Sequence, residues 1–201
     1  MKLKKLVSIV VAGLISASVL PLSAIAANEV AQIGTIGYET VALAVAAADE
    51  GDKITLVSNV NEDVVIPVGK TITLNLGGFK LTNVKGHTIT NNGKLTIEGE
   101  GTVDNTTHPK GALVSQGNSE TTINGGTYTR SLEAGIPTSN GKNSWYVMQV
   151  KNTAVLTINE GTTVTNTSKF SSLIDNYSEI IINGGTFTNG FNVLKTEEKT
   201  K

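Results

Sequence analysis

The sequence has no cysteine, a single tryptophan and only 4% aromatic residues. Without cysteine, disulfides cannot stabilise the chain, and no thiol follows the N-terminal apolar segment to carry a lipid. Sixteen Lys and Arg residues balance 17 Asp and Glu residues, and no basic stripe runs along the chain. Nucleic acid is therefore excluded as an expected partner, because phosphate binding depends on clustered positive charge. Threonine, asparagine and glycine are abundant instead, a mixture that favours short strands and tight corners over helices.

The first 26 residues form a predicted targeting segment. Three lysines within the first five residues precede an uncharged apolar run at 6–20, and Ala24-Ile-Ala26 offers small residues at the cleavage positions, an order typical of a secretory signal peptide. A membrane anchor is the alternative, but the run is shorter than the ~20 residues of a spanning helix, and Pro21 interrupts it. We therefore expect cleavage after Ala26 and export to the medium or the cell surface. The mature chain is expected to be one domain with no transmembrane segment.

The rest of the chain is dominated by a degenerate repeat. In five copies, an aliphatic pair is followed, after a glycine-containing corner, by one residue that is expected to be buried. These post-corner residues are Leu81, Val103, Tyr128, Val164 and Phe187, spaced 22, 25, 36 and 23 residues apart. Self-similarity at such a period indicates a stacked solenoid, and the short spacings fit one turn of three strands joined by corners.

The repeat predicts an all-β fold, a right-handed parallel β-helix with three sides and about five turns over residues 53–194. The preceding segment, 27–52, is predicted to form a strand at 32–38 and an alanine-rich helix at 39–49 that caps the first turn. A hairpin at each Asn-Gly pair is the alternative. It does not explain why the segments before and after each pair resemble other turns more than each other. A charged tail, 195–201, follows the last turn.

Each predicted turn also contains an earlier aliphatic residue. Four pairs share this pattern, with the first member eight residues before the second, or nine in the pair that begins at Val114. The pairs are Ile89 and Ile97, Val114 and Ile123, Val150 and Ile158, and Ile174 and Ile182. We expect both members of each pair to point inward and to stack on their counterparts in adjacent turns.

Several blocks carry a family resemblance. Residues 38–56 join the predicted capping helix to the first strand, and the coil pattern recurs at 70–79 and in two copies of Ile-Asn-Gly-Gly-Thr-aromatic-Thr, at 123–129 and 182–188. These blocks resemble the exported bacterial right-handed β-helix proteins of the pectate-lyase-like superfamily, over nearly all of the mature chain. That superfamily includes polysaccharide lyases and hydrolases, surface adhesins and proteins with no known activity. The resemblance therefore implies a fold and does not imply a reaction.

The one long spacing places about 13 extra residues between Arg130 and Ser144. Insertions in a solenoid emerge as loops on one face, and that face is often where ligands bind. A flat aromatic side chain beside a cation and amides suits sugar recognition. The candidate ligand-binding residues are Arg130, Asn140, Asn143, Trp145 and Tyr146. The alternative is that Trp145 packs back against the coil and Tyr146 begins the next strand.

No catalytic residue, metal site or cofactor is predicted. Glu98 and Glu100 are the best carboxylate pair, yet acids on a strand surface need no function, and glycoside cleavage requires two well-placed carboxyl groups. The two histidines, His87 and His108, are expected in loops between turns, and no Asp-x-Asp calcium cluster occurs.

A threonine array is also predicted on the outer face. Three Thr-x-Thr copies align, at 127–129, 163–165 and 186–188. Flat arrays of this kind are typical of ice-binding solenoids, whereas the simpler explanation is the preference of exposed strands for threonine. Asp104 interrupts the array.

No second helix follows the last predicted turn. Either Phe191, Val193 and Leu194 cover it, or its open end associates with another subunit. Taken together, these patterns favour a secreted or surface-associated, non-catalytic module that binds glycan. The alternatives are a polysaccharide lyase or glycoside hydrolase of the same fold, and a self-assembling architectural coil.

Overall fold

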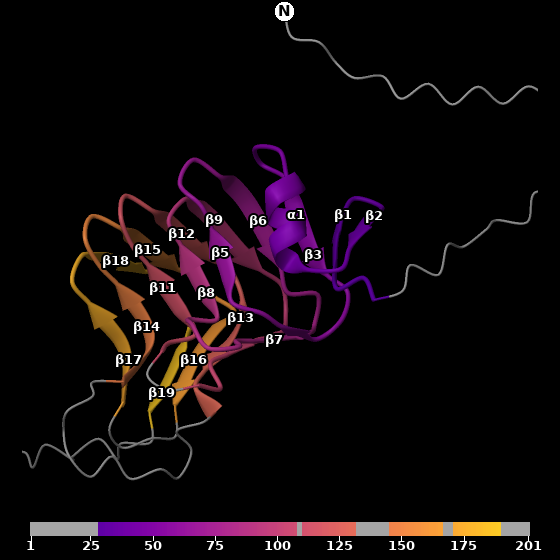
Figure 1. Ribbon diagram of the computed structural model, residues 1–201. Helices are drawn as coiled ribbons and strands as arrows, with labels where there is room; N and C mark the ends of the chain where they lie inside the picture. The colour runs from indigo at the N-terminus through magenta and orange to yellow at the C-terminus, as the bar shows by residue number, and fades with distance from the viewer. Residues whose placement is uncertain (1–27, 108–109, 132–144, 167–170, 190–201) are drawn as a thin grey trace, which may run out of the picture.

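The computed structural model describes residues 28–107, 110–131, 145–166 and 171–189. Its chain winds into a parallel β-solenoid, with one short helix and a hairpin at the N-terminal end (Figure 1). The predicted all-β solenoid is thereby confirmed. The predicted signal peptide and the charged tail lie outside the described residues. Within the described ranges, no helix is long and apolar enough to cross a membrane.

Each turn contributes one strand to each of three sheets, named A, B and C here. The parallel strands of sheet A are β3 (Lys53–Leu56), β6 (Thr71–Asn75), β9 (Lys94–Glu98), β12 (Glu120–Ile123), β15 (Val155–Ile158) and β18 (Glu179–Ile182). Sheet B contains β4 (Val60–Asn61), β7 (Lys80–Thr82), β10 (Thr102–Asp104), β13 (Gly126–Thr129), β16 (Thr162–Asn166) and β19 (Thr186–Asn189). Sheet C contains β5 (Val64–Ile66), β8 (Ile89–Asn91), β11 (Leu113–Ser115), β14 (Trp145–Val150) and β17 (Ser171–Asn176).

The solenoid makes about four turns, one fewer than the sequence predicts. Followed along sheet C, the chain completes one circuit between each strand and the next, from β5 to β17. The five motif copies in the sequence mark five levels of the stack, and five levels are separated by only four circuits. The remaining strands of sheets A and B add partial turns at the two ends.

The N-terminal segment closes one end of the stack. The single strand predicted at 32–38 is instead a hairpin of β1 (Ala31–Ile33) and β2 (Ile36–Tyr38), and β1 also pairs antiparallel with β3. The turn between the two strands contains Gly34 at φ +60, a backbone conformation that glycine adopts at little cost. The helix α1 (Val41–Ala47) falls within the predicted range and buries one side against the first turn.

Two charged side chains of the first turn fasten α1 at both ends. The Glu62 carboxylate accepts hydrogen bonds from the backbone N–H groups of Val41 and Ala42, at 2.9 and 2.8 Å. The Lys70 ammonium donates to the carbonyl of Ala48 at the other end. A negative charge near the N-terminus of a helix and a positive charge near its C-terminus both interact favourably with the helix dipole. The cap is therefore held by charge as well as by apolar packing.

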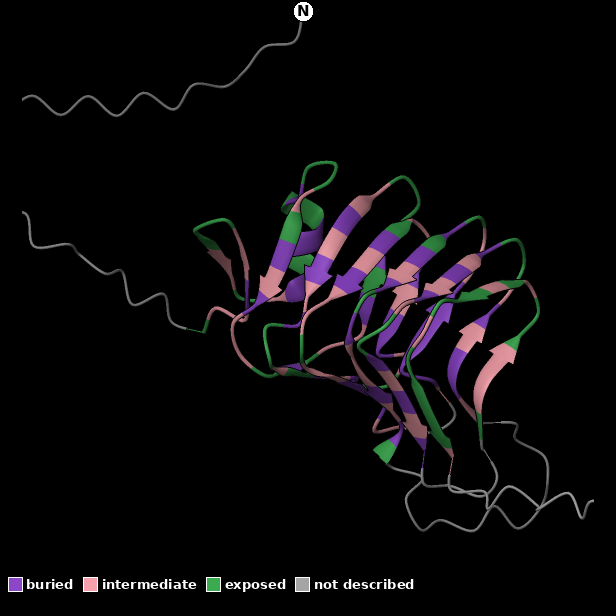
Figure 2. Ribbon diagram, turned by 180° about the vertical axis from the view of Figure 1, so that it is seen from behind, coloured by how far each residue is buried: buried purple, intermediate pink, exposed green. Residues whose placement is uncertain are grey.

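The core is a set of apolar columns that run along the axis. The predicted column of post-corner residues is confirmed as a stack, because Leu81, Val103, Tyr128, Val164 and Phe187 pair in register through sheet B. The first four are buried as predicted, whereas Phe187, in the last strand, is exposed. In sheet A, Leu74, Ile97, Ile123, Ile158 and Ile182 pair in the same way. Figure 2 shows the resulting alternation of buried and less buried positions along the strands. Side chains of successive turns thus stack on one another, which gives the solenoid a continuous core.

One part of the predicted core is wrong by one residue. In sheet C the inward column is Ile89, Leu113, Met148 and Ile174. Val114 instead pairs with Thr90 and Gln149 on the outward side. The sequence predicted that Val114 and Val150 stack on Ile89. The residues that occupy this column are Leu113, one residue before Val114, and Met148, two residues before Val150. Sheet C follows the irregular corners, so spacing alone could not fix its register.

The outer faces carry polar ladders. The threonine array is confirmed as a stacked feature, since Thr127, Thr163 and Thr186 pair in register, as do Thr165 and Thr188. At the end of sheet A, the Asn159 side-chain amide donates to the Asn124 oxygen at 2.7 Å, and the Asn183 amide donates to the Asn159 oxygen at 2.8 Å. These side-chain bonds link adjacent turns in addition to the backbone ladder.

Candidate functional site

The insertion predicted to contact ligand begins where β13 ends. Its first candidate, Arg130, is only 1% exposed, so its guanidinium lies inside the protein and not on the surface. Asn140 and Asn143 lie outside the described residues. Trp145 is the first residue of β14, and its side chain is likewise outside the description. Of the five candidates, the structure therefore places two side chains, those of Arg130 and Tyr146.

Tyr146 is the second residue of β14, and its side chain is half-buried. Its ring stacks on the imidazole of His87, with ring centroids 6.1 Å apart and planes 22° apart. Beneath the ring is Gly111, where a Cβ atom would come within 2.9 Å of the tyrosine ring carbons. Glycine is thus required at this position for the ring to pack. The sequence correctly predicted that His87 lies in a loop between turns. It did not predict the contact with Tyr146, because only the strand register brings the two rings together.

His87 is held as a neutral imidazole. Its Nδ1 atom accepts a hydrogen bond from the backbone N–H of Gly111 at 3.0 Å. Burial, together with the nearby charge of Lys110, lowers the pKa of His87 to about 4. With Nδ1 occupied as an acceptor, the proton of the neutral ring is on Nε2. This histidine therefore offers one donor and an aromatic face, and at neutral pH it carries no charge.

A buried carboxylate lies next to the start of the insertion. Asp104 shares an outer column with Thr82 and Thr129, yet it is fully buried. Its Oδ2 atom pairs with the Lys80 ammonium at 2.7 Å, and its Oδ1 atom accepts from the backbone N–H of Ser131 at 2.8 Å. The interruption that Asp104 makes in the threonine array is thus structural, because the carboxylate fixes the first residue of the insertion.

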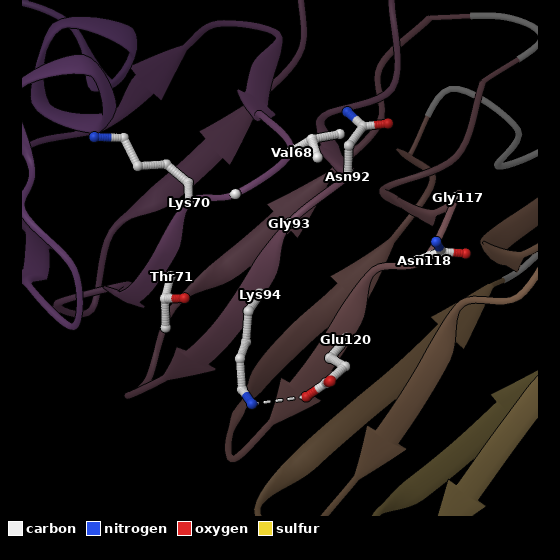
Figure 3. A pocket seen from close by; sticks show the side chains of 10 residues that line it. Val68, Lys70, Thr71, Asn92, Gly93, Lys94, Gly117, Asn118 and Glu120 are labelled. Carbon is white, nitrogen blue, oxygen red and sulfur yellow. Dashed lines mark ion pairs between the residues drawn. The ribbon is translucent and has the colours of Figure 1, made fainter.

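A separate groove of about 420 Å³ lies at the corner between sheets C and A. It crosses three successive turns, and Figure 3 shows its lining. The lining residues are Val68, Gly69, Lys70, Thr71, Asn92, Gly93, Lys94, Gly117, Asn118 and Glu120. Each of the three turns contributes one glycine to the lining, Gly69, Gly93 and Gly117. No aromatic residue is among the lining residues, and sequence reasoning did not find this groove.

Two of the three charged side chains around the groove form an ion pair. Lys94 and Glu120 form an exposed ion pair at 2.8 Å, drawn as a dashed line in Figure 3. The Lys70 side chain points away from the groove toward α1, where its ammonium bonds the helix carbonyls. Asn92 accepts a hydrogen bond from the Gln116 side-chain amide at 3.0 Å. Polar and charged residues therefore line the groove, but most of the surface that it exposes is apolar, and its net charge is small.

Several carboxylates elsewhere in the described chain also have structural partners. Glu98, of the predicted carboxylate pair, bonds Lys53 at 2.7 Å. Asp63 accepts from the backbone N–H groups at 84–86, with the shortest distances 2.9 Å. Asp175 accepts from the Gln149 side-chain amide at 2.9 Å. Among the described residues, no group of three or more His, Cys, Asp or Glu side chains is placed to hold a metal ion.

No family model, curated protein or solved structure matches this chain.

Proposed function

We propose that this chain is an exported, non-catalytic β-helix module that binds glycan, of the pectate-lyase-like kind that its sequence resembles. The observation that carries the proposal is the groove between sheets C and A. Polar and charged residues line it over a mostly apolar surface, its net charge is small, and it runs across three turns of the stack.

The chemistry of the groove suits a neutral ligand with many hydroxyl groups. Exposed Asn118 presents an amide, and half-buried Thr71 presents a hydroxyl, so both donors and acceptors face the ligand. Val68, which is 84% exposed, adds an apolar contact for the C–H face of a sugar ring. The Lys94–Glu120 pair contributes no net charge. Lys70 lines the groove without a carboxylate partner, but its ammonium is bonded to the carbonyls of Ala46 and Ala48. A neutral glycan therefore suits this lining better than a phosphate or a polyanion.

The environment of the acidic residues supports a binding role over a catalytic one. Glycosidic cleavage uses two carboxyl groups on either side of the bond, one of which must act as an acid. Glu98 and Glu120 are each ion-paired to a lysine, and Asp63 and Asp104 are held by backbone amides. A carboxylate engaged in this way stabilises the fold and is poorly placed to exchange protons with a substrate.

The test is binding of the chain from Ala27 to Lys201 to a broad panel of polysaccharides. The groove variant is Lys94→Ala with Glu120→Ala, which removes the exposed pair without changing the net charge. Its matched control is Lys53→Ala with Glu98→Ala, the other lysine–glutamate pair on the outer face of sheet A, outside the groove. We expect the groove variant to weaken binding at least tenfold and the control to bind as the wild type does.

Three other results would redirect the proposal. If Tyr146→Ala abolishes binding and the groove variant does not, the contact region is the insertion predicted from sequence. Release of soluble sugar products in the same wells would support the lyase or hydrolase alternative. If the folded protein binds no glycan in the panel, the glycan proposal fails. Export is tested separately by mass spectrometry of protein from the culture medium, where an N-terminus at Ala27 is expected.

A further inference from the structure

The two ends of the solenoid differ. At the N-terminal end, the β1–β2 hairpin pairs antiparallel on β3, and α1 covers the core. At the other end, β18, β19 and β17 are the outermost strands of sheets A, B and C, and each has one edge without a partner strand among the described residues. Such an edge presents a row of backbone donors and acceptors that can pair with another strand.

The inward-facing columns of the core end at this edge of the solenoid. Ile182 is 54% exposed and Phe187 is 37% exposed, although Ile158 and Val164, one turn earlier in the same columns, are fully buried. These side chains have core positions, but no further turn covers them within the described residues. Burying them would gain roughly 25 cal/mol per Å² of apolar surface.

A change in the outer face of sheet A coincides with the open edge. One outward column is threonine in four successive turns, at Thr73, Thr96, Thr122 and Thr157. In the last strand, that column continues with Ile181, which is 41% exposed. A solvent-facing position that is polar throughout the stack becomes apolar only where the stack ends. The apolar surface of the last turn therefore includes its outer side as well as its core side.

We propose that this open edge binds the same edge of a second copy, tail to tail, about a two-fold axis that passes through Ile181 and is perpendicular to the solenoid. The two β18 strands then pair antiparallel. Directly opposed residues of an antiparallel pair lie on the same side of the sheet. Inward positions must therefore face inward positions, and this requirement places the axis on a residue and not between two residues.

The registers that satisfy this condition differ in chemistry. An axis through Ile181 sets Ile181 opposite Ile181 of the partner subunit, Ile180 opposite Ile182 of the partner subunit, and Glu179 opposite Asn183 of the partner subunit. An axis through Ile180 would set the Glu179 carboxylate against an isoleucine, and an axis through Ile182 would set Ile181 against an asparagine. Only the axis through Ile181 matches apolar with apolar and polar with polar along the whole strand.

The same axis completes the other two sheets. A two-fold perpendicular to a coil preserves its hand and pitch, so it brings β17 of one copy alongside β19 of the other, antiparallel and at the same separation as the β18 strands. All three open edges are then paired, and the core columns continue from one copy into the next. At the N-terminal ends, β2, β4 and β5 also have one edge without a partner strand among the described residues, but α1 covers the core there. A dimer is therefore expected and not a filament.

The test is sedimentation of the chain from Ala27 over a range of concentrations, for which a mass of two chains is expected. Ile181→Lys places two ammonium groups opposite each other at the axis and is expected to give single chains at the same concentration. The matched control is Thr157→Lys, one turn earlier in the same outward column, which is expected to remain dimeric.

A cross-link tests the register independently. The chain contains no cysteine, so Ile181→Cys introduces a single thiol. Directly opposed residues of an antiparallel pair have Cβ atoms roughly 4.5–5.5 Å apart, near the range that a disulfide spans. We expect a covalent dimer on mild oxidation of Ile181→Cys and none with Thr157→Cys. The proposal is overturned if the wild type sediments as single chains at every concentration, or if a dimer survives Ile181→Lys. A dimer that forms only after removal of 190–201 would also overturn it, because that segment would then be the occupant.

Discussion

Replacing Tyr128 by phenylalanine is expected to stabilise this protein. Tyr128 lies in the inward column of sheet B, between Val103 and Val164, and it is fully buried. Its hydroxyl oxygen is inaccessible and has no hydrogen-bond partner among the described residues. The neighbours in its column are aliphatic, so the hydroxyl loses its hydration on folding without gaining a protein partner in return.

The size of the effect follows from two opposed contributions. A buried hydroxyl left unpaired costs about 1–3 kcal/mol. Phenylalanine removes that cost and keeps the ring, at the expense of a small void where the oxygen was. We expect the free energy of unfolding to rise by about 1 kcal/mol, which corresponds to a Tm increase of roughly 2–4 °C for a chain of this size.

Thermal and urea unfolding of the wild type and Tyr128→Phe measure this difference, with Tyr38→Phe as the control at a half-buried position outside the sheet B column. The control is expected to stay within about 0.5 kcal/mol of the wild type. A loss of stability in Tyr128→Phe would refute the reasoning, because it would mean that the hydroxyl has a favourable partner in the folded protein.

The pH dependence provides a second check on the same residue. Burial raises the pKa of Tyr128 well above its usual range. The unfolded chain therefore releases this proton near pH 10 while the folded chain retains it, so stability is lost as the pH rises above about 10. Tyr128→Phe lacks this contribution, and its stability is expected to fall less steeply over the same alkaline range.

Three further predictions concern polar contacts. Because the pKa of His87 is lowered to about 4, the stability that it contributes is complete above about pH 6.5 and is lost as the pH falls toward 4; urea unfolding of His87→Gln should show a flatter acid limb. Lys80→Met leaves the buried Asp104 carboxylate without its cation and is expected to lower the unfolding free energy by about 2–4 kcal/mol, against less than about 1 kcal/mol for Lys53→Met at an exposed pair, both measured in urea. Asn159→Ala breaks two side-chain hydrogen bonds between turns and is expected to cost about 1 kcal/mol in thermal unfolding, and no loss would mean that the asparagine ladder adds nothing to the backbone pairing.

The parts of the fold that could be predicted from sequence are those that repeat. Stacking forces equivalent residues into one column, so the spacing of Leu81, Val103, Tyr128, Val164 and Phe187 was enough to find sheet B in register. The capping helix was also predictable, because alanine-rich sequence favours a helix wherever tertiary contacts do not oppose it. The number of turns was overestimated by one, because the motif copies mark levels and not circuits.

The parts that could not be predicted depend on corners. The register of sheet C is set by how many residues each corner uses, and that number varies from turn to turn, so Leu113 and not Val114 faces inward. The groove escaped notice for the same reason, since its lining comes from three corners far apart in sequence. His87 and Tyr146 meet only because Gly111 leaves room for the ring. The predicted contacts of Asn140 and Asn143 fall outside the described residues and stay predictions.

Departures from the repeat are the most informative positions in such a chain. A residue that matches its column needs no explanation beyond stacking, whereas a mismatch needs a local cause. Asp104 replaces a threonine and is compensated by Lys80 and by the backbone of Ser131. Ile181 also replaces a threonine, but it is still 41% exposed in this chain. Groups of the same chain compensate the first mismatch. The second mismatch lies on an open strand edge, and a symmetric partner is the cause that would bury it.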